Sequence, residues 1–475
     1  MIGRFLWRAG PPGDPVFGNG EIMINTLYLP ELRELLDEDN DAELAEFCTA
    51  LHPARTADFM EGLTTDERWS VLQHADIESR VGIFSYFDRE CQVDAVGSQD
   101  RREVAEVIAA MPPDDRVDLL NDVESQVVSE LLPLLPAVER RDILRLRAYP
   151  EESAGALMTT EFAELSENLS VKEAIDEIGR QARELETISY LYIVDDDQSD
   201  QLRGVISARQ LISAVARPEI TLGQLMERDL VTVNVLDDQE EIANKVAHFD
   251  LLAIPVIDDD RRMLGIITHD DIIDVFREEA TEDAHRIAGV DPLEQSYLET
   301  GIFTLTWKRG VWLIVLFVGA LLTAFALTYY DENHLQWWSW LVVFIPLVIS
   351  SGGNSGNQSA TLIITAMVTG DVTLRNWYQV IRRELFVGLM LGCGLGTIGF
   401  VAALAMNYSL LQSAVLPITL LLVVVSGTLL GASLPLIFKR LGLDPALMSN
   451  PFVAGIIDIL GIVIYMSVAA CLLSR

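Results

Sequence analysis

The spacing of apolar and polar positions changes three times along the 475 residues, after an N-terminal extension at 1–24. Residues 25–148 carry Leu, Ala, Glu and Arg at helical spacing with proline punctuation, which predicts short helices packed in pairs. Pro53 and Pro113 are each followed by an acid and then by apolar residues. This single echo favours a helical repeat, although one echo can arise by chance.

Residues 149–275 switch to a duplicated pattern of apolar runs of strand length. The runs at 188–196 and 251–259 lead into the similar segments Gly204–Ser207 and Gly265–Thr268, and a helix-like segment follows each. This layout resembles a tandem pair of CBS domains, a regulatory α/β module. Residues 276–306 are polar and helical in pattern at their start, and we expect a connecting helix there.

Residues 307–475 contain apolar stretches long enough to cross the roughly 30 Å hydrocarbon core of a membrane as helices. We predict five spans, at about 309–330, 338–368, 385–406, 414–438 and 446–473. Lys and Arg lie before the first span, between the second and third, and between the fourth and fifth. By the positive-inside rule, we expect a cytoplasmic N-terminus and an external C-terminus.

The predicted fold class is therefore multi-domain. It combines an all-α helical N-terminal domain, an α/β tandem CBS pair, a connecting helix and an all-α transmembrane domain of five helices.

The charges divide near the same boundary. Residues 301–475 hold eight of the 34 Lys and Arg and six of the 71 acids, which leaves a net charge of −39 for residues 1–300. Such a region repels the phosphates of nucleic acid, so we expect no nucleic-acid partner, and it attracts cations. On charge alone, a merely soluble or salt-adapted surface explains the excess equally well.

The segment 345–368 interrupts an apolar span with Gly, Asn, Gln and hydroxyl residues. Because unpaired backbone groups cost several kcal/mol each in hydrocarbon, we expect an irregular backbone that is buried in protein or lines a watery path. Asn354, Asn357 and Gln358 are neutral oxygen donors that suit a hydrated divalent cation, and they are pore-lining candidates. The alternative is a helix-packing face, since Gly352 and Gly356 fit the GxxxG pattern.

Asp458 is the one acid deep within a predicted span. A carboxylate in the middle of a bilayer costs about 2.5 kcal/mol or more, and it normally faces a bundle interior or a water-filled cavity. No basic residue lies within a predicted span to neutralise it, so a cation is its natural partner. The alternative is a protonated Asp458 hydrogen-bonded to a neighbouring helix.

Two runs, PLVISSGGNSGNQSATLIITA from Pro346 and DPALMSNPFVAGIIDILGIVIYMSVA from Asp444, closely resemble the MgtE family of Mg²⁺ channels and transporters. The order of domains resembles that family over nearly the whole chain. The resemblance implies a homodimeric, Mg²⁺-selective channel for Mg²⁺ uptake, in which two copies of Asp458 hold a largely hydrated Mg²⁺. It also implies that Ala454 offers a backbone carbonyl to this ion and that Asp444 lies near the cytoplasmic mouth.

The resemblance further implies that Mg²⁺ bridges the N domain, the CBS domains and the connecting ("plug") helix and thereby closes the pore. Without the metal, clustered carboxylates repel one another and favour an open, mobile cytoplasmic region. Any one of the matching acids is equally well explained as part of a solvated helix face. The matching acids are Asp114, Asp118, Asp238, Glu240, Asp250, Asp271, Asp274, Glu279, Glu282 and Asp283.

Alternatives remain at this point. CBS pairs often bind adenine nucleotides, and Thr268 and Asp271 match the usual pattern, whereas the first copy has Ser207 and Gln210, so ATP binding stays open. The runner-up function is a secondary transporter of Mg²⁺ or Co²⁺, although five spans without an evident inverted repeat argue against it. A third is a membrane-anchored CBS signalling protein. We expect no enzyme, because no Ser/His/Asp, Walker or metal-hydrolase arrangement appears.

Overall fold

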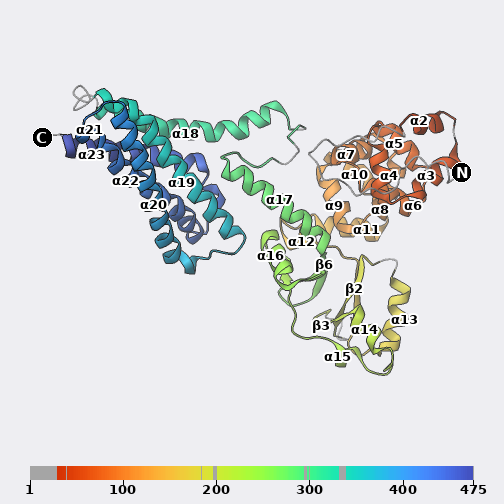
Figure 1. Cartoon of the computed structure of the whole chain (residues 1–475). Coiled ribbons are helices and arrows are strands. Elements are labelled where there is room, and N and C mark those ends of the chain that lie inside the picture. Colours follow the sequence, from red (N-terminus) through yellow and green to blue (C-terminus); the bar gives the residue numbers. More distant parts are fainter. Residues whose placement is uncertain are drawn as a thin grey trace, which may run out of the picture. The chain divides into compact units, whose positions relative to one another are not determined.

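The computed structural model describes residues 29–38, 40–182, 185–195, 200–293, 297–298, 300–330 and 339–473. The chain forms two compact units, Met1–Val275 and Phe276–Arg475. The boundary falls inside one helix, α17 (His269–Ile287), so the chain continues from one unit to the next without a break in the helix (Figure 1). The predicted extension at 1–24 lies outside the described residues.

Short helices build the N-terminal part of the first unit. Several begin at a side chain that accepts a hydrogen bond from a backbone amide of the first turn, as Thr64, Asp76 and Asp100 do. Their apolar faces share one buried core. The helices are α2 (Leu29–Asp37), α3 (Asp41–Ala50), α4 (Pro53–Met60), α5 (Thr65–Leu72), α6 (Ile77–Phe84), α7 (Arg89–Ser98), α8 (Arg101–Ala110), α9 (Pro113–Asp122), α10 (Ser125–Leu131) and α11 (Ala137–Leu146).

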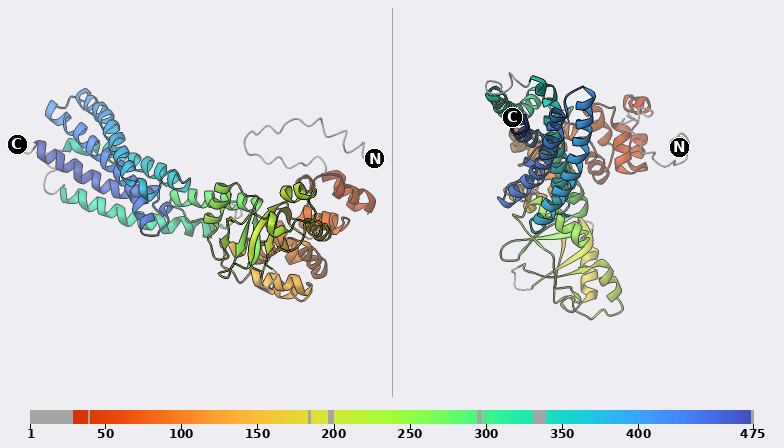
Figure 2. Two further views of the ribbon diagram at one scale, coloured as in Figure 1. Left: turned by 90° about the horizontal axis from the view of Figure 1, so that it is seen from below. Right: turned by 60° about the vertical axis from the view of Figure 1, so that its left-hand side comes forward.

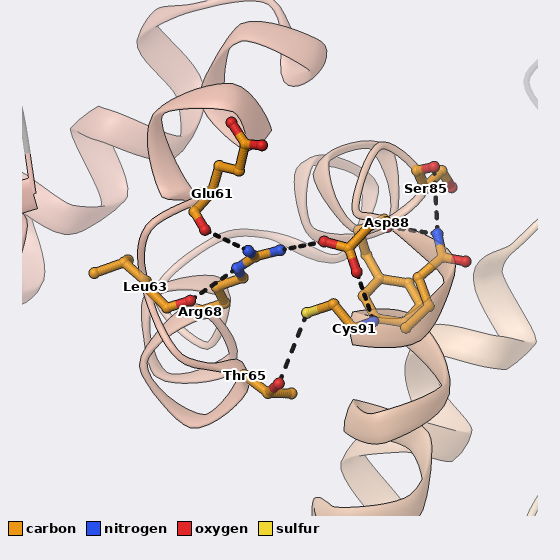
Figure 3. Close-up of polar contacts among 9 residues, drawn as sticks. Glu61, Leu63, Thr65, Arg68, Ser85, Asp88 and Cys91 are labelled. Atoms are coloured by element: carbon orange, nitrogen blue, oxygen red, sulfur yellow. Dashed lines mark hydrogen bonds and ion pairs between the residues drawn. The ribbon is translucent and has the colours of Figure 1, made fainter. Parts of the chain in front are cut away.

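A buried arginine holds three of these helices together (Figure 3). The guanidinium of Arg68 donates to the backbone carbonyls of Glu61 and Leu63 at 2.7 and 3.2 Å and to the Asp88 carboxylate at 3.1 Å. Asp88 also accepts from the amide of Cys91 at 2.8 Å and so caps α7. A buried charge is tolerated when it is paired in this way, and here it fixes the α4–α5 turn to the start of α7.

The predicted duplication appears as two small sheets of the same topology. In each, the first strand pairs parallel with the second, and the second pairs antiparallel with the third. The copies meet where the amide of Leu202 donates to the carbonyl of Arg261 at 3.0 Å, and Tyr192, Met263 and Ile266 share a core there. The elements are α12 (Ala154–Leu157), β1 (Phe162–Ser166), α13 (Val171–Gln181), β2 (Thr187–Val194), β3 (Leu202–Ser207), α14 (Ala208–Ala214), α15 (Leu222–Leu225), β4 (Val233–Asn234), α16 (Gln239–Phe249), β5 (Ala253–Ile257) and β6 (Met263–Thr268).

Long helices make up the second unit (Figure 2). Among the described residues, four helical segments are long and apolar enough to cross a membrane: Ile302–Tyr330, Leu374–Ala405, Leu410–Arg440 and Asn450–Leu473. The second predicted span differs, because 339–344 form a 3₁₀ helix and α19 has the length of a span but less apolarity. A fifth span therefore stays a prediction. The elements are α18 (Ile302–Tyr330), η2 (Ser339–Phe344), α19 (Ile345–Val368), η3 (Leu374–Asn376), α20 (Trp377–Ala405), α21 (Leu410–Ser413), α22 (Val415–Arg440), η4 (Pro445–Leu447) and α23 (Asn450–Leu473).

The expectation of an irregular backbone at 345–368 is wrong, because these residues form the continuous helix α19. The glycines serve close packing instead. A Cβ atom at Gly431 would lie 2.2 Å from the carbonyl oxygen of Gly356, and one at Gly427 would lie 2.7 Å from that of Gly352. The GxxxG alternative is therefore the correct interpretation of Gly352 and Gly356. The helix keeps its backbone hydrogen bonds internal, as a bilayer demands.

Candidate functional site

A cluster of carboxylates lies within the first unit, where α9 approaches the second CBS copy. We call it the acidic cluster; it consists of Asp114, Asp115, Asp118, Glu186, Asp270, Asp271 and Asp274. Asp114 is buried, and its Oδ1 atom has no hydrogen-bond partner among the described residues. The cluster joins four predicted acids, namely Asp114, Asp118, Asp271 and Asp274.

The acidic cluster is short of positive charge. Burial and then the charges of Asp271 and Asp115 raise the pKa of Asp114 well above its ordinary value. Burial is also the largest cause of the raised pKa values of Asp118 and Asp271, both about 6, and of Glu186, about 7. Like charges nearby add to each of these shifts.

Arg89 is the cation that opposes this effect at the α9 side of the cluster. It lowers the pKa of Asp115 and of Asp118, although in both the larger effect of burial raises it. Its guanidinium already pairs with Asp122 at 2.6 Å. The negative charge that Arg89 leaves unneutralised on the acidic cluster favours a bound cation.

The carboxylates do not converge on one point. Across the described residues, no three His, Cys, Asp or Glu side chains stand close enough to hold a metal ion directly. Mg²⁺ sheds its water reluctantly and is often bound through one or two carboxylates with several waters retained. The acidic cluster thus fits a hydrated Mg²⁺ better than a dehydrated ion in a tight cage.

Three further predicted acids lie at the two ends of α16, with Asp238 and Glu240 at its start and Asp250 at its end. Asp238 caps the helix start by accepting from the amide of Glu240 at 3.0 Å, and Asp250 ends it in the left-handed region at φ 52°. Eleven helical residues rise about 16 Å, so Asp238 and Asp250 of one chain cannot bind one ion together. Their capping roles explain these residue types locally.

The remaining predicted sensor acids and Asp444 belong to the second unit. Glu279, Glu282 and Asp283 lie on the last turns of α17. Glu282 forms an ion pair with Arg286, and Arg286 also pairs with Asp444. Asp444 caps η4 by accepting from the Ala446 amide at 2.8 Å, directly before α23. The end of the connecting helix is thereby joined to the segment that leads into the helix of Asp458.

Asp458 lies on a polar stripe between α19 and α23. Asn450, Ala454 and Asp458 are spaced by four residues on α23 and share one face. A Cβ atom at Gly353 of α19 would lie 3.7 Å from Oδ1 of Asp458 and 3.7 Å from Cβ of Ala454. The side chain of Asp458 is half-buried and faces a helix contact. The carbonyl of Ala454 belongs to the regular helix and keeps one lone pair for a ligand.

The polar stripe continues along α19. Thr361 donates its hydroxyl to the side-chain oxygen of Asn450 at 3.1 Å. Asn357, one turn before Thr361, has a buried Oδ1 atom without a hydrogen-bond partner among the described residues. Asn354 and Gln358 are exposed on the single chain. Of the three pore-lining candidates, Asn357 is the one placed in the stripe with Asp458.

Sequence reasoning missed several residues of these sites. Asp115 and Asp270 stand beside predicted acids, so the paired Asp-Asp pattern could have pointed to them. Thr361 lies four residues after Asn357, and Asn450 lies four residues before Ala454, so helical spacing could have pointed to both. Glu186 offers no such signal, because it joins the acidic cluster from the start of β2, far away in the sequence.

A second acid among the long helices was also missed. Glu384 lies two turns inside α20, which begins at Trp377, eight residues before the predicted span start. Its carboxylate accepts from the hydroxyl of Ser359 on α19 at 2.7 Å, and Thr428 of α22 donates its hydroxyl to the Glu384 backbone carbonyl at 3.3 Å. Glu384 thus joins three helices by hydrogen bonds.

The residues compared with the nucleotide-binding pattern of CBS domains, Thr268 with Asp271 and Ser207 with Gln210, occupy equivalent places in the two CBS copies. Thr268 ends β6, and its amide donates to the carboxylate of Asp271 at 3.1 Å. Ser207 ends β3, and its amide donates to Gln210 at 2.8 Å. The first copy therefore builds the same turn with an uncharged side chain.

Comparisons with known proteins agree along most of the chain. Residues 345–468 match a family described as a divalent cation transporter, MgtE; residues 51–152 match the MgtE intracellular N domain; and 154–217 and 222–278 match the CBS domain. The Magnesium transporter MgtE of Thermus thermophilus is 35% identical over 445 residues, which cover 93% of this chain and 98% of that protein.

Solved structures match about half of the chain. The crystal structure of the soluble part of a magnesium transporter is 34% identical with a TM-score of 0.50 and covers 55% of this chain and 100% of its own. A crystal structure of the cytosolic domain of the Mg²⁺ channel MgtE in complex with ATP is 32% identical, with a TM-score of 0.48. It covers 51% of this chain and 98% of its own. With a relative of this identity matched over nearly its full length, the predicted family is confirmed: the chain belongs to the MgtE family of magnesium transporters.

Proposed function

We propose that the protein is a Mg²⁺ channel of a plasma (bacterial inner) membrane that Mg²⁺ itself closes from the cytoplasm. Family membership makes the chain a multi-pass membrane transporter of Mg²⁺ and not an enzyme. The observation that carries the proposal is the position of Asp458, half-buried on the polar stripe with no basic residue in its helix or in α19. A carboxylate at such a place is stabilised when a dication is its partner.

The ion path would lie on the two-fold axis of a homodimer. Two copies of Asp458 around one hydrated Mg²⁺ balance its charge without stripping its water shell. The unpartnered Oδ1 of Asn357 and the carbonyl of Ala454 offer further oxygens to that shell. In support of a second copy, no residue of α18 is buried within one chain.

Closure would start at the acidic cluster. At low Mg²⁺, the unneutralised carboxylates around Asp114 and Asp271 repel one another and separate α9 from the CBS pair. Bound Mg²⁺ removes this repulsion and favours the compact state. The helix α17 carries Asp271 near its start and Arg286 near its end, so its position would be passed to Asp444 and the start of α23.

Current recording on the full chain tests this proposal. Discrete conductance steps with Mg²⁺ as the permeant ion, and closure by millimolar Mg²⁺ on the cytoplasmic side, are the expected results. Smooth, saturating flux that depends on a counter-ion would instead indicate a secondary transporter of Mg²⁺ or Co²⁺. The triple variant Asp271→Asn, Asp274→Asn, Asp283→Asn should stay open at high Mg²⁺. Unchanged inhibition in that variant contradicts the role of these acids.

ATP is a second ligand to be tested at the CBS pair. The turn formed by Thr268 and Asp271 presents a hydroxyl and a carboxylate at the start of α17, where a ribose and phosphates bind in the related pattern. Because Asp271 also belongs to the acidic cluster, ATP and Mg²⁺ would act on the same helix. Calorimetric titration of ATP into the full chain, with Asp271→Asn as the comparison, measures whether nucleotide binding depends on this residue.

A further inference from the structure

An apolar groove lies between the start of α20 and the end of α22. Leu374, Trp377 and Ile381 line it from one side and Leu436 and Ile437 from the other, around a space of about 590 Å³. Trp377 is 56% exposed and Ile437 49% exposed, so the groove is open on the single chain. Neither the polar stripe nor the acidic cluster uses any of these residues.

The rim of the groove is strongly basic. Arg440 itself lines the groove, and Arg375 and Arg382 directly follow two of the lining residues in the chain. With Lys439 and Arg383, five of the eight Lys and Arg of residues 301–475 gather at these two helix ends. All five side chains are exposed, and within the described residues none stands within ion-pair distance of a carboxylate.

The apolar lining and the basic rim of the groove favour different parts of one ligand. Inside a bilayer, an apolar depression fills with hydrocarbon chains and not with water. Trp377 and Tyr378 are both exposed here, and aromatic rings of this type sit at the level of the lipid headgroups. Unpaired Arg and Lys beside them attract phosphate, and basic pockets between membrane helices are suited to anionic headgroups.

We propose that this groove binds one anionic phospholipid, with an acyl chain along Leu436 and Trp377 and the phosphate against Arg440 and Arg375. A second copy of the chain is a poorer occupant. A symmetric contact through this face would place five unpaired cations against five more, and such like charges repel. By the charge distribution of the connections, the leaflet concerned is the cytoplasmic one.

Native mass spectrometry of the full-length protein tests the proposal with phosphatidylglycerol, phosphatidylethanolamine and inorganic phosphate as separate probes. The wild type should retain phosphatidylglycerol in preference to phosphatidylethanolamine. The double variant Arg375→Gln, Arg440→Gln should weaken this retention by about fivefold for each cation removed. Ile437→Trp, which fills the groove and leaves the cations, should weaken it as well.

The matched control is Arg309→Gln, which removes an exposed cation near the start of α18 away from the groove. It should retain phosphatidylglycerol like the wild type. Equal loss in Arg309→Gln, or equal retention of both lipids by the wild type, overturns the proposal in favour of a general surface charge. Displacement of the lipid by inorganic phosphate alone also overturns it, because the apolar groove would then have no part. A disulfide-linked dimer of Trp377→Cys would show that a second copy covers the groove.

Discussion

The two units of the molecule handle negative charge in opposite ways. In the first, carboxylates such as Asp114 and Asp271 gather until burial and mutual repulsion raise their pKa values. In the second, Asp458 is the one acid on its polar stripe, between helices that contact one another through glycine. If the acidic cluster is the sensor, as proposed, each acid removed should cost only part of the response. If Asp458 is the pore site, as proposed, one acid per chain has no substitute. The difference ranks the effects of substitutions in the two units.

The largest effect is expected from Asp458→Asn, which keeps the size of the side chain and removes its charge. Two charges lost beside one dication in a dimer should lower Mg²⁺ uptake by about 100-fold or more. Uptake is measured by Mg²⁺-dependent growth of cells that lack their own importers and by influx into proteoliposomes. Asp371→Asn, an exposed acid in the turn after α19, is the control and should transport normally. Full transport by Asp458→Asn would break the contrast between the units.

The next effect concerns the glycine contacts that bring the helices of the second unit together. Gly431→Ala places a Cβ atom 2.2 Å from the backbone oxygen of Gly356, and backbone cannot move aside as a flexible side chain does. We expect a loss of about 1–3 kcal/mol in the free energy of unfolding, seen as a lower melting temperature in detergent. Gly394→Ala on α20 meets no atom within 4 Å and is the matched control. Equal melting temperatures of Gly431→Ala and Gly394→Ala would mean that close packing at Gly431 is dispensable.

A smaller effect is expected from pH at the acidic cluster. The pKa values of Asp118 and Asp271, about 6, and of Glu186, about 7, lie above those of the unfolded chain. Stability from the protonated carboxyls is therefore complete below about pH 4 and is lost as pH rises through 6 to 7. Without divalent cations, hydrogen-exchange protection of α9 in the full chain should fall by roughly tenfold from pH 5 to 8.

Millimolar Mg²⁺ should restore this protection at pH 8 and change little at pH 5, where protons occupy the carboxyls instead. The variant Asp118→Asn, Glu186→Gln provides the control, since it should show a flatter pH dependence. A wild-type profile that rises with pH would contradict the charge repulsion assigned to the acidic cluster.

Sequence reasoning succeeded where a local pattern reports on local structure. The duplicated strands, the apolar helices and the position of Asp458 within a helix all follow from periodicity and residue type. It failed at 345–368, because Gly and Asn usually weaken helices, and the close packing of Gly356 against Gly427 and Gly431 has no signal in a single sequence. It also missed Glu186, which reaches the acidic cluster through the fold alone. The pairing of Asp444 with Arg286, 158 residues away, has no signal in a single sequence.

The smallest effect is expected where the connecting helix meets the start of α23. Arg286 and Asp444 are each about one-third exposed, at 32% and 31%, so their ion pair contributes about 0.5–1 kcal/mol. If this pair transmits closure, Arg286→Gln and Asp444→Asn should each raise the Mg²⁺ concentration for half-closure by about two- to fivefold.

Asp444→Asn also weakens the cap of η4, so the pair must be isolated by a double-mutant cycle on current recordings. The double variant should then need no more Mg²⁺ for half-closure than the more affected single variant does. Glu282→Gln, which removes the other partner of Arg286, serves as the comparison. Strictly additive shifts would show that the two residues act separately, and the link from the acidic cluster to Asp458 would have to run through another contact.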